Sequence, residues 1–395
     1  MAEAKKKPRR LILHNFLSSE ECKELEYIHK SNSTVGYRPN VFSTTLSHLI
    51  ATNCSHFIVP FVPIRERLKE KVEEFFGCEF ELFVEFTGLI SWTKGASIGW
   101  HSDDNRPYLK QRDFAAVCYL SSFGKDFNGG LFHFQDGEPS TIVPMAGDVA
   151  LYTADSTNVH SVDEIIEGER LTLTLWFSRD STHDEDAKLI SLLSEKMMNS
   201  SNDIPWSNLP IMASSNMYWF CPEATAGQRL GFYICCARLY VLGFDIYSPQ
   251  GKSSFSDFAE LLMESVQLAW RNKLFGQEFA NILHLLQVVQ FYCWKHLELL
   301  NSNHKVKMCK VIEISQSKQE NIDAMKSLIL KDHQLANTVL SCGNNDHQHS
   351  FDWAIFSAAV AAWEDYTYKL HKKLVMSLPY WKMQGIIYDV ELEGS

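Results

Sequence analysis

The sequence predicts an α+β protein in which helices flank a β-rich segment. From about residue 80 to residue 178, short β-branched and aromatic runs alternate with Gly, Asn and Asp. Apolar residues recur at helical spacing before this segment, and further helical patterns follow it. Many short strands at roughly even spacing are typical of a sandwich or a small barrel-like jelly roll.

The N-terminal part predicts a strand, a loop and two helices. Residues 11–30 contain the strand and the first helix, which opens with the capping-box pattern Ser18-x-x-Glu21. The second helix is predicted from Ile64 to Phe76, because its apolar residues follow helical spacing and Gly77 stands where a C-cap is expected.

The β-rich segment predicts seven strands. Asn128-Gly129-Gly130 and Ala146-Gly147-Asp148 are turn sequences between them. The predicted strands are Phe80–Phe86, Leu89–Thr93, Phe114–Leu120, Gly130–Phe134, Ser140–Pro144, Val149–Thr153 and Leu171–Phe177.

A polar, charged stretch at Arg179–Asp186 indicates a domain boundary. We expect one domain over residues 1–185 and a mainly α-helical domain of unknown role over 186–395; as an alternative, Ala187–Met197 continues the first domain as a packing helix. The helices predicted in the second domain are one around Phe258–Trp270, opened by Asp257-x-x-Glu260, and three at Gln277–Leu300, Glu320–Leu340 and Phe351–Leu374.

Composition excludes some functions and indicates a compartment. The 395 residues are 45% hydrophobic and carry a formal net charge of −11, which argues against a general nucleic-acid binder. The ten cysteines form no CxxC pair, so we expect reduced thiols and an intracellular, cytoplasmic or nuclear protein. The sequence has no run of about 18 apolar residues, so we expect no membrane-spanning helix. The basic cluster Lys5–Arg10 is either a solvated start or a nuclear address.

The stretch Gly99–Arg106, GWHSDDNR, contains the pattern His-x-Asp. This triplet is common by chance, and a polar surface loop is the alternative interpretation. His160 and Arg170 follow later in the chain. Two imidazoles and one carboxylate on one face of a metal suit Fe(II) and leave three positions open. We therefore predict that His101, Asp103 and His160 bind iron.

Arg170 stands at the start of a predicted strand. A planar guanidinium can hold the distal carboxylate of a dicarboxylic cosubstrate. Residues two apart on a strand point to the same side, so Arg170, Thr172, Thr174 and Trp176 are expected to share a face. The hydroxyl of Thr172 is then placed beside the guanidinium.

Further motifs occur in order between residues 10 and 180. They are Phe16-Leu17-Ser18-x-x-Glu21-Cys22, Trp92-Thr93-Lys94-Gly95 ahead of His101-x-Asp103, Cys118-Tyr119-Leu120, Gly129-Gly130-Leu131-Phe132-His133-Phe134, Val143-Pro144-Met145-Ala146-Gly147-Asp148-Val149-Ala150-Leu151-Tyr152, His160, Arg170 and Trp176-Phe177. In this order they resemble the Fe(II)- and 2-oxoglutarate-dependent dioxygenases, and among them the prolyl 4-hydroxylase catalytic-domain group.

Three positions depart from that group's pattern. Phe132 replaces a threonine that usually stands two places after the paired glycines, and Ile98 replaces a tyrosine three places before the first metal histidine. Arg170 stands where many members have lysine. These departures concern the cosubstrate pocket and the substrate class rather than the metal ligands.

The resemblance implies a fold, cofactors and an activity. The fold is a double-stranded β-helix, and the cofactors are Fe(II), 2-oxoglutarate and O2, with L-ascorbate commonly rescuing oxidised iron. Arg170 would pair with 2-oxoglutarate, and Thr172 and Tyr119 stand in for missing polar contacts. The implied reaction decarboxylates 2-oxoglutarate to succinate and hydroxylates a prolyl or lysyl side chain of a protein or peptide.

Other interpretations stay open at this stage. The chain could be an oxygenase acting on nucleic acid or a small molecule, although its acidic balance argues against nucleic acid. It could also be a non-catalytic or metabolite-sensing module whose helical domain recruits a protein partner. Oligomeric state is open. Asp104, His133, His183–Asp186 and the cluster Cys342–His349 are expected to be ordinary polar residues rather than metal ligands.

Overall fold

The structure is a computed structural model. It describes residues 9–199 apart from 33–34, 39, 52–53 and 80, residues 287, 290–295 and 297–299, and residues 353–391. The helices predicted around 257–270 and at 320–340, the cluster at 342–349 and most of the basic N-terminus lie outside the described residues. Among the helices described, none is long and apolar enough to span a membrane.

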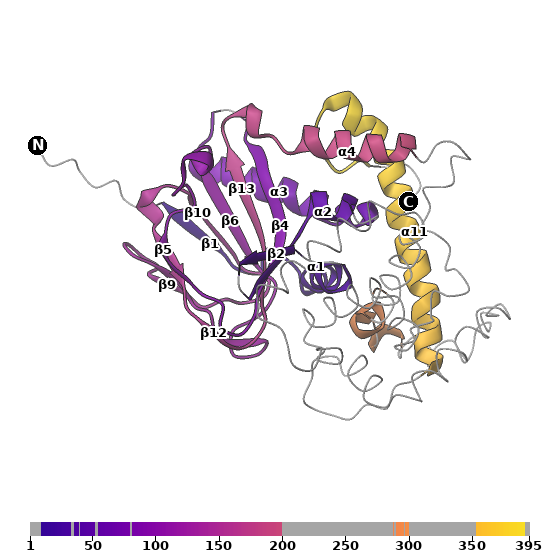
Figure 1. The fold of residues 1–395 in the computed structure, drawn as a ribbon, viewed down its shortest axis with the longest axis horizontal. Helices are drawn as coiled ribbons and strands as arrows, with labels where there is room; N and C mark the ends of the chain where they lie inside the picture. The colour runs from indigo at the N-terminus through magenta and orange to yellow at the C-terminus, as the bar shows by residue number, and fades with distance from the viewer. Residues whose placement is uncertain are drawn as a thin grey trace, which may run out of the picture.

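A large antiparallel sheet forms the centre of the described fold, and a smaller antiparallel sheet faces it (Figure 1). A third pairing, β7 (Phe127–Gly129) with β12 (Ile165–Gly168), lies at one end. In spatial order the large sheet contains β1 (Arg10–Leu13), β10 (Val149–Thr153), β6 (Phe114–Tyr119), β13 (Arg170–Ser178), β4 (Phe83–Trp92), β3 (Val41–Thr45) and β2 (Val35–Arg38), and the smaller one β5 (Ile98–His101), β11 (His160–Val162), β8 (Phe132–Phe134) and β9 (Thr141–Ile142).

The helices cover the face of the large sheet that points away from the smaller sheet (Figure 1). They are α1 (Ser19–Ser31), α2 (Leu46–Ala51), α3 (Phe61–Phe76), α4 (Asp186–Asn199) and α11 (Trp353–Gln384), with short 3-10 turns η1 (Ser55–Ile58), η2 (Pro107–Leu109), η3 (Ser156–Asn158) and η4 (Ser181–His183).

Strand β13 separates two apolar cores. Leu171, Leu173 and Leu175 belong to the core between the large sheet and the helices. Their neighbours Thr172 and Thr174 point to the other side, where they line a pocket between the two sheets. The alternation along an extended strand therefore gives one face to packing and the opposite face to the candidate site.

Most of the predicted elements before residue 200 are confirmed. The capping box at Ser18 and Glu21 forms as expected, and α3 ends at Gly77 in the left-handed conformation. The separation of Phe80–Phe86 from Leu89–Thr93 was wrong, because β4 runs through both. Gly88 lies in the gap between the two predicted strands. It pairs with Thr174 on one side and Thr45 on the other, so the neighbouring strands hold its backbone extended.

The C-terminal helix α11 packs onto the sheet domain. Trp381 is 1% exposed and belongs to the same apolar core as Leu25 and Leu173. The hydroxyl of Tyr366 donates to Glu24 of α1 at 2.7 Å. Residues on both sides of position 185 therefore share one core, and the division into two domains there stays a prediction. Helix α4 packs on this core, which agrees with the alternative prediction that Ala187–Met197 continues the first domain as a packing helix.

Asp186 links α4, α3 and the segment after α11. Its carboxylate forms a buried ion pair with Arg65 and accepts the backbone N–H of Ile387 at 3.0 Å. The expectation of an ordinary charged linker at His183–Asp186 was wrong for this residue, which begins α4 and is 8% exposed.

Replacing Asp186 by alanine is expected to lower the free energy of unfolding by about 3 kcal/mol or more. Removing one partner leaves the Arg65 guanidinium buried without its counter-ion, which typically costs about 3–5 kcal/mol. Urea denaturation of the full chain measures the change. Glu74→Ala, which breaks the exposed pair with Lys71, is the control and should cost less than about 1 kcal/mol. Equal losses in both variants would contradict a linking role for Asp186.

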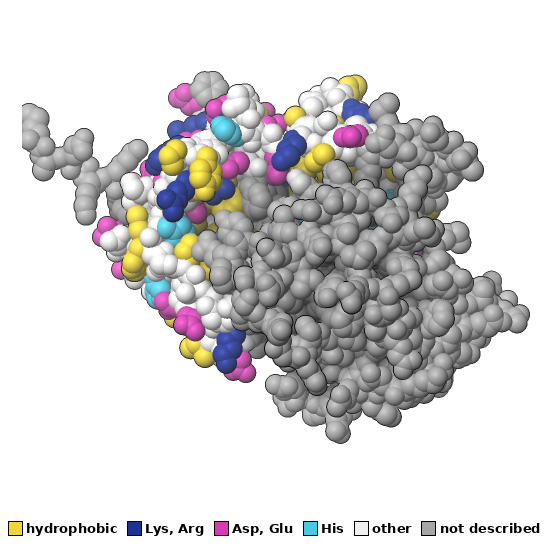
Figure 2. Space-filling model, viewed as in Figure 1, with side chains coloured by type: hydrophobic (Ala, Val, Ile, Leu, Met, Phe, Trp, Pro, Cys, Tyr) yellow, Lys and Arg dark blue, Asp and Glu magenta, His cyan; other side chains and the backbone are white. Residues whose placement is uncertain are grey.

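The described part of the face in Figure 2 mixes lysine and arginine with aspartate and glutamate, and histidines lie among them. This face therefore lacks, over its described residues, the single-sign basic stripe that is typical of nucleic-acid binding.

Candidate metal and cosubstrate site

The three predicted metal ligands converge in the pocket between the sheets. His160 of β11 lies directly opposite His101 of β5 in the antiparallel register. Asp103 follows the end of β5, and its Oδ1 lies 3.8 Å from Nε2 of His160. One ligand atom from each of the three residues lies within 4.8 Å of the others. Cross-strand pairing thus brings together residues that are far apart in sequence.

Hydrogen bonds orient both imidazoles. Nδ1 of His101 lies 2.8 Å from the carbonyl oxygen of Gly99, and Nδ1 of His160 lies 2.9 Å from that of Asn158. A carbonyl only accepts, so each Nδ1 carries a proton, and in the neutral ring Nε2 then presents a lone pair. A backbone partner on the far nitrogen is the usual support of a metal-bound histidine.

The surroundings fit a divalent metal. His160 is 3% exposed, and its ring stacks on Phe132 at 4.8 Å between centroids. Oδ2 of Asp103 is buried and has no hydrogen-bond partner among the described residues. Burial, together with the charge of Asp103, raises the pKa of Tyr152 well above its ordinary value. A buried carboxylate costs free energy unless a cation compensates it, so this donor set suits Fe(II).

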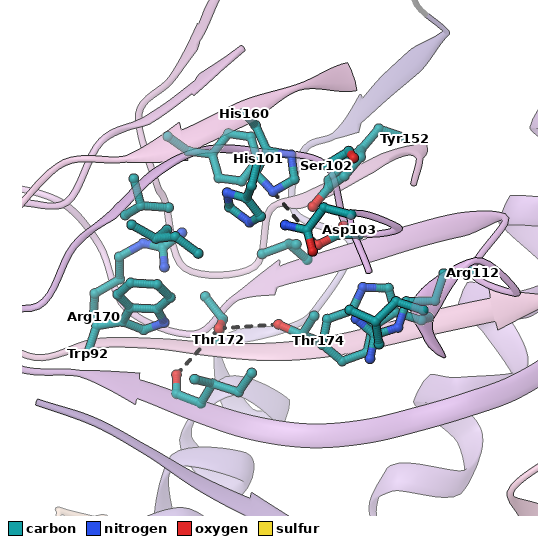
Figure 3. Close-up of a pocket in the computed structure, with 18 residues that line it drawn as sticks. Trp92, His101, Ser102, Asp103, Arg112, Tyr152, His160, Arg170, Thr172 and Thr174 are labelled. Carbon is teal, nitrogen blue, oxygen red and sulfur yellow. Dashed lines mark hydrogen bonds and ion pairs between the residues drawn. The ribbon is translucent and has the colours of Figure 1, made fainter. Parts of the chain in front are cut away.

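Arg170 lies at one end of the same pocket, next to Trp92 (Figure 3). It is 2% exposed, and its Nε has no hydrogen-bond partner among the described residues. Burial lowers the pKa of Arg170, and the nearby hydroxyl of Tyr119 partly opposes this. Among the ion pairs of the described residues, none involves Arg170. A buried guanidinium without a carboxylate partner is suited to an anionic ligand.

Gly130 leaves room for the stem of Arg170. Its φ is +64°, and a Cβ atom added there would lie 2.3 Å from Cδ1 of Ile165 and 3.2 Å from Cδ of Arg170. The paired glycines in the sequence therefore have a physical reason at this site. The backbone must turn in the left-handed region while two side chains approach it closely.

Gly130→Ala is expected to lower stability by about 2 kcal/mol or more, because a left-handed backbone and a clash act together. It should also weaken binding of a dicarboxylate, since the clash displaces the Arg170 stem. Gly124→Ala is a matched control. Its φ is +77° but no atom lies within 4 Å, so only the strain of about 1 kcal/mol applies. Thermal unfolding of both variants tests this, and similar losses would contradict the close approach.

The other end of the pocket holds Arg112 (Figure 3), which lies against the pocket-lining Trp176. Cζ of Arg112 lies 3.9 Å from the centroid of the Trp176 ring, and its Nε donates to Oε1 of Glu85 at 3.1 Å. The carboxylate of Glu85 fixes one edge of the Arg112 guanidinium. The metal-ligand cluster thus lies between two arginines.

Of the two residues predicted to add polar contacts to the cosubstrate, Thr172 lines the pocket and Tyr119 does not. Thr172 lines the pocket, and its hydroxyl donates to the carbonyl of Ile90 at 3.4 Å. Tyr119 lies behind Arg170, with its ring 5.3 Å from Cζ; burial raises the pKa of Tyr119 to about 12, while Arg170 opposes this. It is not among the pocket-lining residues, so contact of Tyr119 with a cosubstrate stays a prediction.

Polar neighbours of the site behave as ordinary residues. Asp104 accepts hydrogen bonds from Ser102 at 2.8 Å and Lys110 at 2.7 Å. His133 bridges Thr141 and Asp163 on the outer side of the small sheet. The sequence interpretation missed Arg112 and Tyr152. Tyr152 lies in a predicted strand, and its alternation with Leu151 could have placed it on the pocket side.

Comparison with known proteins identifies a family model that matches the part of the chain containing this site. Residues 87–178, which include all three metal-ligand candidates and Arg170, match the family model of the 2OG-Fe(II) oxygenase superfamily. This segment belongs to that superfamily. The oxygenase segment runs from β4 to the end of β13, so it contains both ends of the pocket.

The chain is similar to an oxygenase domain-containing protein and to a prolyl hydroxylase. The chain is 29% identical over 128 residues to 2-oxoglutarate and iron-dependent oxygenase domain-containing protein 3 of Rattus norvegicus, covering 30% of this chain and 41% of the relative. It is 24% identical over 220 residues to prolyl 3-hydroxylase 1 of Gallus gallus, covering 45% and 30%. The match therefore spans less than half the length of these relatives.

Among solved structures, a prolyl-4-hydroxylase from Pseudomonas putida aligns with 44% of this chain and 93% of its own, at 16% identity and a TM-score of 0.36.

Proposed function

We propose that the chain is an Fe(II)- and 2-oxoglutarate-dependent dioxygenase that hydroxylates a side chain of a protein or peptide. The observation that carries the proposal is a single pocket holding both the His101, Asp103 and His160 cluster and a buried arginine without a carboxylate partner among the described residues. In this proposal the two facing sheets form the double-stranded β-helix of the superfamily.

The chain's own residues have distinct tasks in the proposed reaction. His101, Asp103 and His160 would hold Fe(II) on one face, and the guanidinium of Arg170 would bind the distal carboxylate of 2-oxoglutarate. Iron and 2-oxoglutarate together with O2 supply the oxidising chemistry, which consumes 2-oxoglutarate and releases succinate and CO2. The apolar walls, including Phe132 and Val162, keep bulk water from the reacting groups. Ascorbate is expected to prolong turnover by keeping iron reduced.

The end of the pocket opposite Arg170 is the proposed substrate end. The N–H groups of Arg112 other than Nε–H would donate to a carbonyl or carboxylate of the substrate, and the guanidinium lies over the face of Trp176. Two large aromatic side chains, Trp100 and Tyr108, adjoin the pocket-lining residues His101 and Leu109 in the chain and are 56% and 73% exposed. Exposed aromatics of this size are typical of contact with a macromolecular partner.

Succinate formation and mass spectrometry test the proposal. The full chain with Fe(II), ascorbate and 2-oxoglutarate is incubated with a mixture of proline- and lysine-containing peptides. We expect succinate from the wild-type protein, an added oxygen atom on a peptide, and neither product with His101→Ala. Tight binding of 2-oxoglutarate without any succinate would favour a metabolite-sensing module instead. A folded wild-type protein that binds neither iron nor 2-oxoglutarate would contradict the proposal.

A further inference from the structure

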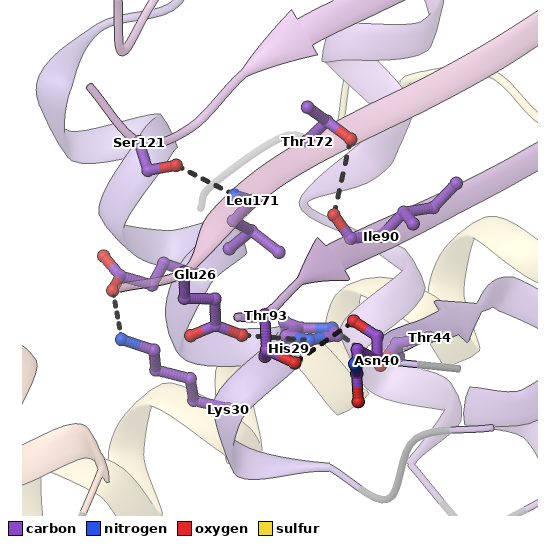
Figure 4. A network of polar contacts seen from close by, with 11 residues as sticks. Glu26, His29, Lys30, Asn40, Thr44, Ile90, Thr93, Ser121, Leu171 and Thr172 are labelled. Atoms are coloured by element: carbon purple, nitrogen blue, oxygen red, sulfur yellow. Dashed lines mark hydrogen bonds and ion pairs between the residues drawn. The ribbon is translucent and has the colours of Figure 1, made fainter. Parts of the chain in front are cut away.

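The residue before Arg170 joins a polar cluster on the far side of the sheet from the pocket. We call it the α1–Glu169 cluster; it consists of Glu26, His29 and Lys30 of α1 together with Glu169. Figure 4 shows Glu26, His29 and Lys30 beneath Leu171 at the start of β13. The cluster is therefore next to the proposed cosubstrate arginine in sequence, although no side chain in it lines the pocket.

Contacts within the cluster tie Glu169 to α1. Oε1 of Glu169 lies 4.0 Å from Nε2 of His29, whose other nitrogen lies 3.0 Å from the hydroxyl of Thr44 in β3. Lys30 donates to Glu26 at 2.5 Å. Burial raises the pKa of Glu169, and the charge of Lys30 opposes this. The carboxylate of Glu169 thus lies at ion-pair distance from His29, which is itself only 1% exposed, and Lys30 acts on it through its charge alone.

The backbone around Arg170 is held on both sides. Before it, Gly168 lies in the left-handed region, and an added Cβ there would approach the carbonyl oxygen of Asp126 to 2.2 Å. After it, the N–H of Leu171 donates to the hydroxyl of Ser121 at 2.8 Å (Figure 4). Glu169 is the side-chain anchor between these two points, since consecutive residues of an extended chain point to opposite sides.

We propose that Glu169 is a positioning residue for 2-oxoglutarate, which fixes the backbone of Arg170 by anchoring it to His29 of α1. The inference rests on the proposed function, because it concerns the affinity of that site for its cosubstrate. A guanidinium recognises a carboxylate through two parallel hydrogen bonds, and a small rotation of its stem removes one of them. Loosening the anchor should therefore weaken the grip on the distal carboxylate and leave the metal ligands, on the opposite sheet, in place.

The test compares two oxo acids on the same protein. The full chain is loaded with Mn(II) to avoid turnover, and calorimetry measures binding of 2-oxoglutarate and of 2-oxobutanoate, which lacks the distal carboxylate. For Glu169→Gln we expect about a tenfold weaker affinity for 2-oxoglutarate, the size of one lost hydrogen bond to a charged group. We expect unchanged affinity for 2-oxobutanoate and for Mn(II).

Two further variants sharpen the experiment. Glu167→Gln, two residues earlier in β12 and exposed, is the matched control and should bind both oxo acids as the wild type does. His29→Leu should reproduce the selective loss, and its combination with Glu169→Gln should add little, because both act through one contact.

Each outcome decides something. Equal weakening of 2-oxoglutarate and 2-oxobutanoate in Glu169→Gln would make Glu169 a general structural residue and overturn the inference. Unchanged 2-oxoglutarate binding in that variant, with loss in Arg170→Met, would overturn the inference and leave the proposed function standing. A wild-type protein that binds Mn(II) but no 2-oxoglutarate would overturn both.

Discussion

Asp103→Ala is expected to weaken Fe(II) binding by about a hundredfold or more. Asp103 is the only carboxylate in the cluster of three ligand candidates, so its removal takes away the charge that balances the cation. Changes in groups that merely support a ligand already cost about 10–100-fold in metal affinity, and a ligand itself should cost at least the upper end. Anaerobic titration with Fe(II) measures the affinity.

The unfolding temperature of Asp103→Ala provides a second test, because this variant should lose metal affinity without losing stability in the metal-free state. Oδ2 of Asp103 is buried without a hydrogen-bond partner among the described residues, so the metal-free wild type bears the cost of that charge. Metal-free Asp103→Ala should therefore unfold at the same or a higher temperature than metal-free wild type. Added metal should raise the unfolding temperature of the wild type only, because ligands stabilise the state that binds them.

The neighbouring Asp104→Ala is the control for both measurements. Its carboxylate faces Ser102 and Lys110 rather than the two histidines. Iron affinity and the metal-induced rise in unfolding temperature should stay close to those of the wild type. If Asp104→Ala loses iron and Asp103→Ala keeps it, the ligand assignment is wrong.

The sequence could predict much of this site because strand periodicity determines which side chains share a face. Arg170, Thr172, Thr174 and Trp176 all line the pocket, as their spacing indicated. The convergence of His101 and His160 depends instead on the register between β5 and β11, which no local pattern specifies. For these two residues the prediction came from the order of motifs rather than from periodicity.

Residues outside regular elements were harder to predict. Arg112 reaches the pocket from the irregular stretch between η2 and β6, where its direction depends on Trp176 and Glu85. Asp186 looked like part of a charged linker, because sequence alone does not show that Arg65, in another helix, lies against it. Both are charged residues whose partners are distant in the chain, and such pairings are a property of tertiary packing.

Arg170→Met is expected to weaken 2-oxoglutarate binding by about 30-fold or more while leaving Fe(II) affinity nearly unchanged. Truncating one partner of a buried, hydrogen-bonded charge pair costs about 2–5 kcal/mol, and 2 kcal/mol corresponds to about 30-fold. The metal ligands come from β5, β11 and the turn after β5, whereas Arg170 comes from β13 of the facing sheet. Calorimetry with the metal-loaded chain and a separate iron titration distinguish the two affinities.

The ligand-free protein should respond in the opposite direction. Arg170 is buried with no ion pair among the described residues, and a methionine of similar length has no charge to bury. We therefore expect ligand-free Arg170→Met to be as stable as the wild type or more stable. Arg170→Lys is the matched variant, since it keeps the charge but loses the planar fork, and its affinity for 2-oxoglutarate should be intermediate. Equal loss of iron and 2-oxoglutarate, together with a lower unfolding temperature, would mean that Arg170 serves the fold rather than the cosubstrate.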